Sequence, residues 1–374
     1  MLMKWTLYLG KVAGIRMFIH WTFIILVVWI FLMHFRMNQS IEDGLLGVAF
    51  ILIIFACVIL HEFGHALTAR KFNIGTKSIT ILPIGGVASI ERMPEKPTQE
   101  LLVAIMGPAV NVVIAVVLYL ILKLTGNIPN TQQLMEQQGS LNLRDSFTFN
   151  LMLVNVALVA FNLIPAFPMD GGRVLRALLS YRMERSKATN VAARVGQFLA
   201  IVFVFAGFYT NFWLVFIGIF IFLGAGGEAT YEATKSVLAD YRVRDVLMTK
   251  YTVLSPGDTM AQAVKALLDG QEKEFLVGDN ETITGVLTRD SIIKGLNELG
   301  KDAPVSDVMR KDFINLQPDM ELQEVYHRMM TNGCSVGPVY EGSRLIGIVD
   351  RENINELVLV NKALKRPSST PGAV

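Results

Sequence analysis

An apolar run near the start of the chain contains two histidines and a glutamate. His61, Glu62 and His65 stand in the order His-Glu-Phe-Gly-His. Residues four apart share one face of a helix, so both imidazoles can hold one zinc ion while the glutamate acts on bound water. A charged group at mid-bilayer costs at least about 2.5–3.5 kcal/mol, so ionisable residues there indicate a functional site. The alternative is a polar helix end exposed to the cytoplasm.

A catalytic zinc ion needs a third protein ligand, and a segment far along the chain offers one. Such sites use three protein ligands and leave one position open for water. The segment 161–172 contains two prolines, which break a helix, and Asp170, the only acid between Asp145 and Glu184. Irregular backbone at membrane depth is tolerated where it lines a cavity or is buried in protein. Asp170 is therefore the candidate third ligand, or a cap for the helix that follows.

The first 230 residues have the hydropathy of a membrane protein. Six apolar segments approach or reach the roughly 20 residues that a bilayer span requires. They are 18–35, 44–69, 101–124, 147–163, 191–208 and 212–229. The last two are separated only by the residues 209–211, which are enough for a tight hairpin; fusing them would leave five spans. We therefore predict a polytopic α-helical membrane protein with about six spans.

Composition and charge agree with that prediction. Hydrophobic residues make up 52% of the 374 residues and charged residues 18%, against roughly 25% in soluble domains. This excludes disorder and argues against a simple soluble enzyme. Lysine and arginine gather on one side of the predicted spans, which places both termini in the cytoplasm and the protein in the cell membrane as a multi-pass protein. The net charge of +2 gives no reason to expect nucleic acid as a partner.

Taken together, these motifs resemble those of the site-2 protease family of intramembrane zinc metalloproteases, over roughly residues 8–230. The matching segments are His61–His65 for HExxH, Asn162–Gly172 for N-x-x-P-x-x-P-x-D-G, Gly107–Asn111 for GxxxN, Ile84–Val87 for the glycine-bearing re-entrant β-hairpin and Gly14–His20 for the N-terminal strand. The resemblance implies an enzyme that cleaves membrane-spanning segments of other proteins within the lipid bilayer. It also implies one Zn²⁺ per chain.

The resemblance also assigns roles to single residues. His61, His65 and Asp170 would be the zinc ligands, and Glu62 the catalytic base. Asn162 and Asn111 would position substrate or stabilise developing charge, although hydrogen bonds between helices explain such amides equally well.

The strand-like segment 79–90 could contact the substrate directly. It has Gly85 and Gly86 at its centre. One edge of it could pair with a locally unwound substrate, as in strand addition. An interfacial loop that only packs on the core is the alternative.

Residues 243–360 repeat themselves at an offset of 62 positions. The aligned pairs are Val243 with Val305, Pro256 with Pro318, Gly285 with Gly347 and Ile292 with Ile354. A constant offset across four landmarks indicates duplication. Each copy reads as a short strand, a helix, two strands and a second helix, an α+β pattern that resembles a tandem CBS pair, a regulatory module that often binds adenine nucleotides.

Two positions decide what the CBS pair could bind. Thr288 would contact a nucleotide in the first copy, whereas the second copy has Asp350 at the equivalent position, where a carboxylate would repel phosphate. Either the pair binds an adenine nucleotide, or it serves as a homodimerisation or substrate-docking platform.

We therefore predict a zinc endopeptidase regulated by a cytoplasmic CBS pair. The predicted parts are a transmembrane protease domain (1–230), a connector (231–241), two CBS repeats (242–300 and 304–362) and a disordered tail (363–374). Two alternatives remain: a metal transporter or channel with CBS regulation, and an inactive relative that binds membrane proteins. Glu62 argues against the first, because a transport site needs no base beside its metal.

Overall fold

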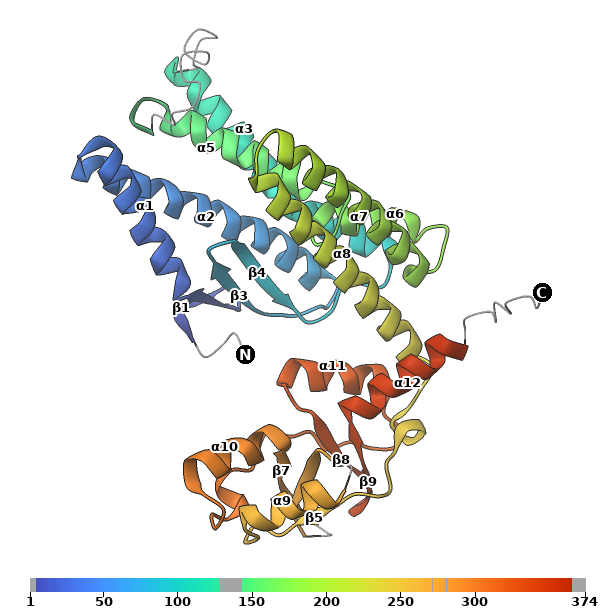
Figure 1. Ribbon diagram of the computed structural model, residues 1–374. Coiled ribbons are helices and arrows are strands. Elements are labelled where there is room, and N and C mark those ends of the chain that lie inside the picture. Colours follow the sequence, from blue (N-terminus) through green and yellow to red (C-terminus); the bar gives the residue numbers. More distant parts are fainter. Residues whose placement is uncertain (1–4, 128–142, 271, 280–281, 365–374) are drawn as a thin grey trace, which may run out of the picture. The chain divides into compact units, whose positions relative to one another are not determined.

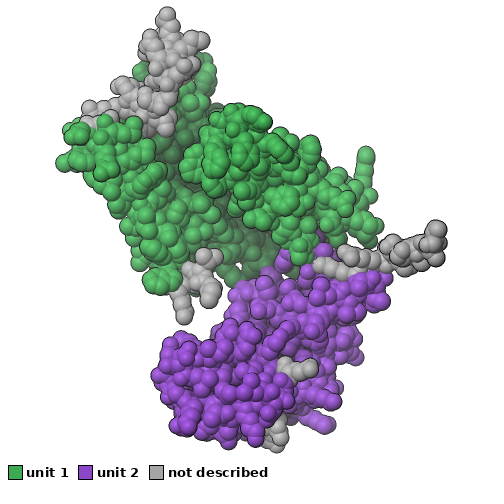
Figure 2. All heavy atoms as spheres, viewed as in Figure 1, with its two compact units in different colours: residues 1–230 green, residues 231–374 purple. Residues whose placement is uncertain are grey.

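The chain folds into two compact units, residues 1–230 and residues 231–374. The computed structural model describes residues 5–127, 143–270, 272–279 and 282–364. Figure 1 shows the elements of both units, and Figure 2 shows which atoms belong to each.

The first unit is mainly helical. Its helices are α1 (Thr22–Asn38), α2 (Ile41–Lys71), α3 (Pro97–Thr125), α5 (Leu143–Asn162), α6 (Asp170–Leu179), α7 (Arg185–Tyr209) and α8 (Trp213–Leu238). Among the described residues, α2, α3, α7 and α8 are long and apolar enough to cross a membrane, while α1 and α5 contain shorter apolar stretches. Each of the six predicted spans therefore overlaps a helix, although the first begins in strand β2 (Ile15–His20), and four of the helices meet the length and composition of a span.

Local sequence signals explain where α2 and α3 begin and end. The Ser40 side chain caps α2 by accepting a hydrogen bond from the Asp43 backbone N–H. Acidic residues in the first turn of α2 and basic residues in the last complement the helix dipole. Helix α3 starts with Pro97 and stops at Gly126, whose φ of +69° is the left-handed conformation that ends a helix. Helices α2, α3 and α5 lie side by side (Figure 1). Apolar side chains pack between them.

A four-stranded sheet packs against α2. Its order is β1 (Thr6–Val12), β2 (Ile15–His20), β3 (Thr76–Leu82) and β4 (Gly85–Ile90), with β2 and β3 parallel and the outer pairs antiparallel. Buried Ile15 and Ile79 of the sheet meet Phe63 and Ala66 of α2. The predicted strand-like segment is thus the β3–β4 hairpin, and β4 is an edge strand of the sheet.

The second unit contains both predicted repeats. The first has β5 (Val253–Leu254), α9 (Met260–Asp269), β6 (Glu274–Gly278), β7 (Ile283–Thr288) and α10 (Arg289–Leu299); the second has α11 (Leu322–Asn332), β8 (Val336–Glu341), β9 (Arg344–Asp350) and α12 (Arg351–Leu364). In place of a counterpart to β5, the second repeat has a single parallel bridge between Leu316 and Val339. The short helical turns that precede the repeats are exchanged, since Val243–Val246 packs in the core of the second repeat and Val305 in that of the first.

The structure places the ends of two helices at or near the predicted domain boundaries. Helix α8 runs without a break through most of the predicted connector, to Leu238. Helix α12 extends to Leu364, two residues into the predicted tail, and residues 365–374 lie outside the described part of the chain.

Thr288 and Asp350 occupy equivalent places, because each accepts a hydrogen bond from the backbone N–H three residues later at the start of a helix. A carboxylate can therefore replace the hydroxyl there without loss of the cap.

Candidate metal centre

Three side chains from two helices converge on one point. His61 and His65 lie one turn apart on α2, and Asp170 is the first residue of α6. Asp170 Oδ2 lies 3.2 Å from Nε2 of His61 and 3.1 Å from Nε2 of His65, and the two imidazole nitrogens are 3.1 Å apart. All three residues are buried. This is the one group of its kind among the described residues whose donor atoms could share a metal ion.

The donor set fits a catalytic zinc ion. Two imidazole nitrogens and one carboxylate oxygen are zinc ligands of the usual kind, and a site with three of them leaves a position for water. The outer nitrogen of each ring is held as well: Nδ1 of His61 lies 2.8 Å from Asn111 Oδ1, and Nδ1 of His65 lies 2.8 Å from the carbonyl oxygen of Val103. Metal-binding histidines characteristically make such a second contact, which orients the ring.

Gly107 of α3 leaves the space that the site needs. A Cβ atom built on this glycine would lie 2.1 Å from Nε2 of His65 and 2.8 Å from Nε2 of His61. Any side chain there would overlap the donor atoms. The glycine of the predicted GxxxN motif is thus explained by close approach of the α3 backbone to the histidines.

Glu62 follows His61 in the chain, and its side chain lies against the edge strand β4. Its side chain is half-buried, and a Cβ atom on Gly86 of β4 would lie 2.9 Å from its Cγ atom. The neighbouring Gly85 has a φ of +139°, and a Cβ on it would meet nothing within 4 Å. Of the two predicted glycines, Gly86 is therefore the one whose missing side chain makes room for the glutamate.

The two predicted asparagines occupy different places. Asn111 contacts His61, as described above, and is fully buried. Asn162 donates from its Nδ2 to the carbonyl oxygen of Leu158 in its own helix, at 2.9 Å. In this arrangement Asn111 acts on a histidine, while Asn162 has a hydrogen bond within α5.

The start of α6 shows which of the two roles considered for Asp170 the geometry supports. The residue before it, Met169, is the N-cap, and no side-chain cap hydrogen bond is made to this helix in the described part of the chain. The second carboxylate oxygen, Oδ1, lies 3.5 Å from Nη1 of Arg173 one turn later. Both carboxylate oxygens of Asp170 therefore contact side chains. Of the two roles, the geometry favours that of a metal ligand over that of a helix cap.

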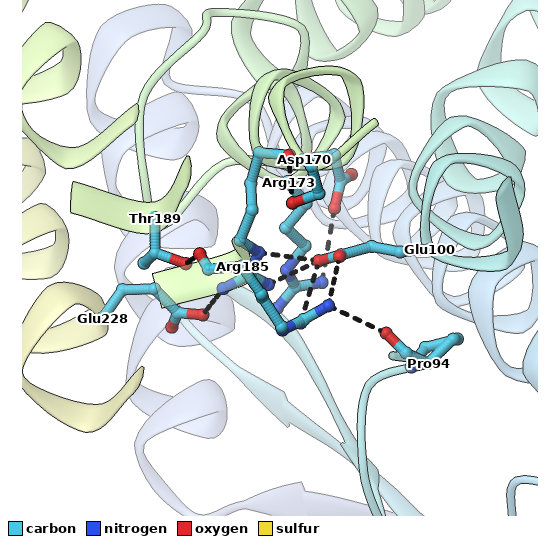
Figure 3. A network of polar contacts seen from close by, with 9 residues as sticks. Pro94, Glu100, Asp170, Arg173, Arg185, Thr189 and Glu228 are labelled. Atoms are coloured by element: carbon cyan, nitrogen blue, oxygen red, sulfur yellow. Dashed lines mark hydrogen bonds and ion pairs between the residues drawn. The ribbon is translucent and has the colours of Figure 1, made fainter. Parts of the chain in front are cut away.

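A buried ion-pair network, shown in Figure 3, fixes the far end of α6. Arg176 donates to Glu100 of α3 (Nε–Oε1, 2.8 Å) and to Glu228 of α8 (Nη1–Oε1, 2.5 Å). Arg185 at the start of α7 donates to the other oxygen of Glu100 at 2.6 Å and to the carbonyl oxygen of Pro94 at 3.0 Å. Glu100 and Arg176 are each 1% exposed. The network connects the helix that carries Asp170 to three other helices.

Sequence reasoning did not single out this network or Asn155 of α5. Asn155 accepts from Asn111 and is fully buried. The signal available for both was the same as for the histidines, namely polar or charged residues inside or at the ends of apolar segments.

Two imidazoles and a carboxylate, buried where apolar helices meet, form a donor set that fits a membrane-embedded metallohydrolase. Comparisons with known proteins agree. Residues 49–203 match Peptidase family M50, and residues 243–298 and 305–359 each match the CBS domain. A zinc metalloprotease of Methanocaldococcus jannaschii is 31% identical over 354 residues, covering 94% of this chain and 96% of the relative.

Two further matches cover the chain to different extents. The protein Rip3 of Mycobacterium tuberculosis is 26% identical over 392 residues, with 97% of this chain and 95% of the relative covered. A solved site-2 protease from M. jannaschii is 35% identical and covers 60% of this chain and 95% of its own, with a TM-score of 0.43. The chain belongs to peptidase family M50, the site-2 protease family, and is a zinc metalloprotease with tandem CBS domains.

Proposed function

We propose that this metalloprotease cleaves membrane-spanning segments of other proteins inside the lipid bilayer, as a step of regulated intramembrane proteolysis. One observation carries the proposal: the donors of His61, His65 and Asp170 meet at a buried point on α2, a helix apolar enough to cross a membrane. We further propose six spans in the cell membrane with both termini in the cytoplasm, as the distribution of basic residues predicts.

The chain's own residues supply the steps of hydrolysis. We propose that His61, His65 and Asp170 hold one zinc ion per chain, which would supply Lewis acidity to a water molecule and to the scissile carbonyl. Glu62, the neighbour of His61, would take the proton of the attacking water and deliver it to the departing nitrogen. Its half-buried position supports this role, since it follows His61 in the chain and its side chain lies against the strand edge.

The edge strand β4 is the proposed substrate contact. An intact helix shields its carbonyl groups, so a membrane-spanning substrate must unwind locally before it can be cut. An unwound segment has free backbone groups, and an edge strand satisfies them by adding the segment to its sheet. β4 is at the edge of its sheet and Gly86 lies against Glu62, which would bring the added segment next to the base.

For the CBS pair we propose a regulatory role in the cytoplasm. An adenine nucleotide is the proposed ligand, with Thr288 as its contact, and self-association of the protein through this pair is the alternative. The Thr288 hydroxyl already accepts a hydrogen bond from the Ser291 backbone N–H at the start of α10. A bound nucleotide would have to share this hydroxyl with the Ser291 N–H. Calorimetric titration of the full-length protein with AMP and ATP, compared with Thr288→Ala, tests the ligand.

Co-expression with candidate single-span membrane proteins tests the proteolytic function. Wild type should produce cleavage fragments, whereas Glu62→Gln should bind zinc and produce none, because it keeps the donors and loses the base. Glu184→Gln is a suitable control, since that side chain is 75% exposed. Fragments produced by Glu62→Gln at the wild-type rate would contradict the role of Glu62.

A further inference from the structure

A chain of buried amides runs from helix α5 to the first histidine of the metal centre. Asn155 Nδ2 donates to the backbone carbonyl oxygen of Leu151 at 2.9 Å, and Asn155 Oδ1 accepts from Asn111 Nδ2 at 3.0 Å. Asn111 Oδ1 in turn faces Nδ1 of His61 at 2.8 Å. Both asparagines are 0% exposed, so no water competes for these groups.

The direction of every hydrogen bond in this chain follows from its end. A backbone carbonyl can only accept, so the amide group of Asn155 must turn its nitrogen to Leu151 and its oxygen to Asn111. That oxygen also only accepts, so Asn111 must present its nitrogen to Asn155 and its oxygen to His61. The His61 Nδ1 then carries the hydrogen, and its Nε2 keeps the lone pair that faces His65 and Asp170.

The other orientation of Asn111 would defeat the site. Its nitrogen would donate to Nδ1 of His61, which would place the imidazole hydrogen on Nε2 and block that atom as a metal donor. Its oxygen would face the oxygen of Asn155, two acceptors without a hydrogen between them. The second histidine does not need such a relay, because a backbone carbonyl, that of Val103, contacts its Nδ1 directly.

We propose that Asn155 is a positioning residue of the metal centre: it fixes the orientation of the Asn111 amide and thereby the tautomer in which His61 meets zinc. The inference rests on the metal centre proposed above. Asn155 contacts no metal donor itself, and its hydrogen-bond path to His61 runs through Asn111. Its Nδ2 also lies 3.6 Å from Sγ of Cys57 on α2. The dependence on Asn111 distinguishes it from a residue that only packs between α2, α3 and α5.

The test is a zinc-binding measurement on the full-length protein in detergent. After removal of metal, the dissociation constant for Zn²⁺ is measured by competition with a chromophoric chelator, for wild type and variants. Asn155→Leu keeps the branching at Cγ and removes the acceptor, so it should weaken zinc binding by about 10–100-fold, the usual effect of losing an outer-shell partner. Asn155→Asp should bind zinc to within about threefold of wild type, since in either protonation state an oxygen remains to accept from Asn111.

Asn150 offers a matched control on the same helix. It is 4% exposed, and its Nδ2 has no hydrogen-bond partner in the described part of the chain. Asn150→Leu makes the same chemical change five residues away and should alter zinc affinity by no more than about twofold, as expected of an uncoupled site. If Asn150→Leu weakened zinc binding as much as Asn155→Leu does, the proposal would be overturned.

A double-mutant cycle with Asn111→Asp separates positioning from packing. A carboxylate at position 111 accepts from His61 in either orientation, and its other oxygen cannot donate to Asn155 Oδ1, so in this background Asn155→Leu removes no hydrogen bond from residue 111. The Asn155→Leu change should therefore have little effect in the Asn111→Asp background, and an equal loss in both backgrounds would show that Asn155 acts through packing alone. If Asn155→Leu does not yield folded protein, Asn155→Ala in the same two backgrounds decides the question.

The same measurements distinguish this inference from the metal centre on which it rests. Wild type should bind zinc and His61→Ala should not; absence of zinc binding in wild type would overturn both the metal centre and the inference. Zinc binding by wild type together with unchanged affinity in Asn155→Leu would overturn the inference alone.

Discussion

Asp170 Oδ2 lies 3.1 Å from Nε2 of His65, although 105 positions separate the two residues in the sequence. The contact depends on the break between α5 and α6, which turns the chain so that α6 begins at the histidines of α2. Three donors gathered from distant segments are a site that assembles only in the folded protein. Metal binding and folding are coupled for such sites, because the unfolded chain holds no comparable set.

Removal of zinc should lower the thermal stability of the protein. A ligand present at about 100 times its dissociation constant stabilises the folded state by about 2.7 kcal/mol. We expect the melting temperature of the detergent-solubilised protein to fall on chelation and to recover with added Zn²⁺. Asp170→Ala should melt at the same temperature with and without zinc, and a full zinc response in that variant would exclude Asp170 as a ligand.

A methyl group on Gly107 should disable the metal centre. Its Cβ would lie 2.1 Å from Nε2 of His65, so the helix or the imidazole must move. Since a displacement of about 1 Å at a catalytic site can reduce the rate by on the order of 100-fold, Gly107→Ala should lose proteolysis by about that factor. Gly227→Ala is the matched control, because a Cβ on that α8 glycine would meet nothing within 4 Å. Equal fragment yields from the two variants would contradict the close approach.

The three candidate metal donors, which the structure brings together, could be singled out from the sequence because their signals are local. The spacing of His61 and His65 places them on one face of a helix, and Asp170 stands out as an acid in an apolar, proline-broken segment. The duplication in the second unit was visible for a similar reason, since a constant offset requires no knowledge of packing. In these cases residue type and spacing alone carry the information.

The supporting contacts could not be predicted, because they depend on how helices rotate against one another. The sequence places Asn111 and Asn155 on separate apolar segments, and nothing in their spacing shows that their amides meet. Likewise, Asn162 belongs to a recognisable motif, yet its amide hydrogen-bonds within its own helix. Which face of a lipid-embedded helix turns inward is decided by tertiary packing.

Loss of the Glu100 charge should destabilise the first unit. This carboxylate is 1% exposed and accepts from both Arg176 and Arg185. Glu100→Gln would leave two guanidinium groups with one fewer buried counter-charge, and removing one partner of a buried ion pair typically costs about 3–5 kcal/mol. The melting temperature in detergent should therefore drop well below that of Glu184→Gln, whose partner Lys187 is exposed. Comparable melting temperatures for the two variants would show that the network contributes little to stability.

In the second unit, Glu274 at the start of β6 is a carboxylate whose surroundings oppose its charge. Burial raises the pKa of this group, a hydrogen bond with Ser335 partly offsets that effect, and the nearby Asp350 raises the pKa further. Its Oε2 atom is buried without a hydrogen-bond partner in the part of the chain that is described. The pKa of Asp350 is raised as well, mainly by burial. The folded unit therefore holds protons on these carboxyls at pH values where the unfolded chain would release them.

The second unit should consequently become less stable as the pH rises above about 4.3, the usual pKa of a glutamate. A raised carboxyl pKa contributes stability that is fully present below the unfolded pKa and is lost as the pH rises through the folded one. Hydrogen exchange of the β6 and β7 amides in the full-length protein, corrected for intrinsic rates, should show weaker protection at about pH 8 than at about pH 5. Glu274→Gln cannot ionise, so its protection should change less between the two conditions. An identical pH response in wild type and Glu274→Gln would show that this carboxyl is not the source of the effect.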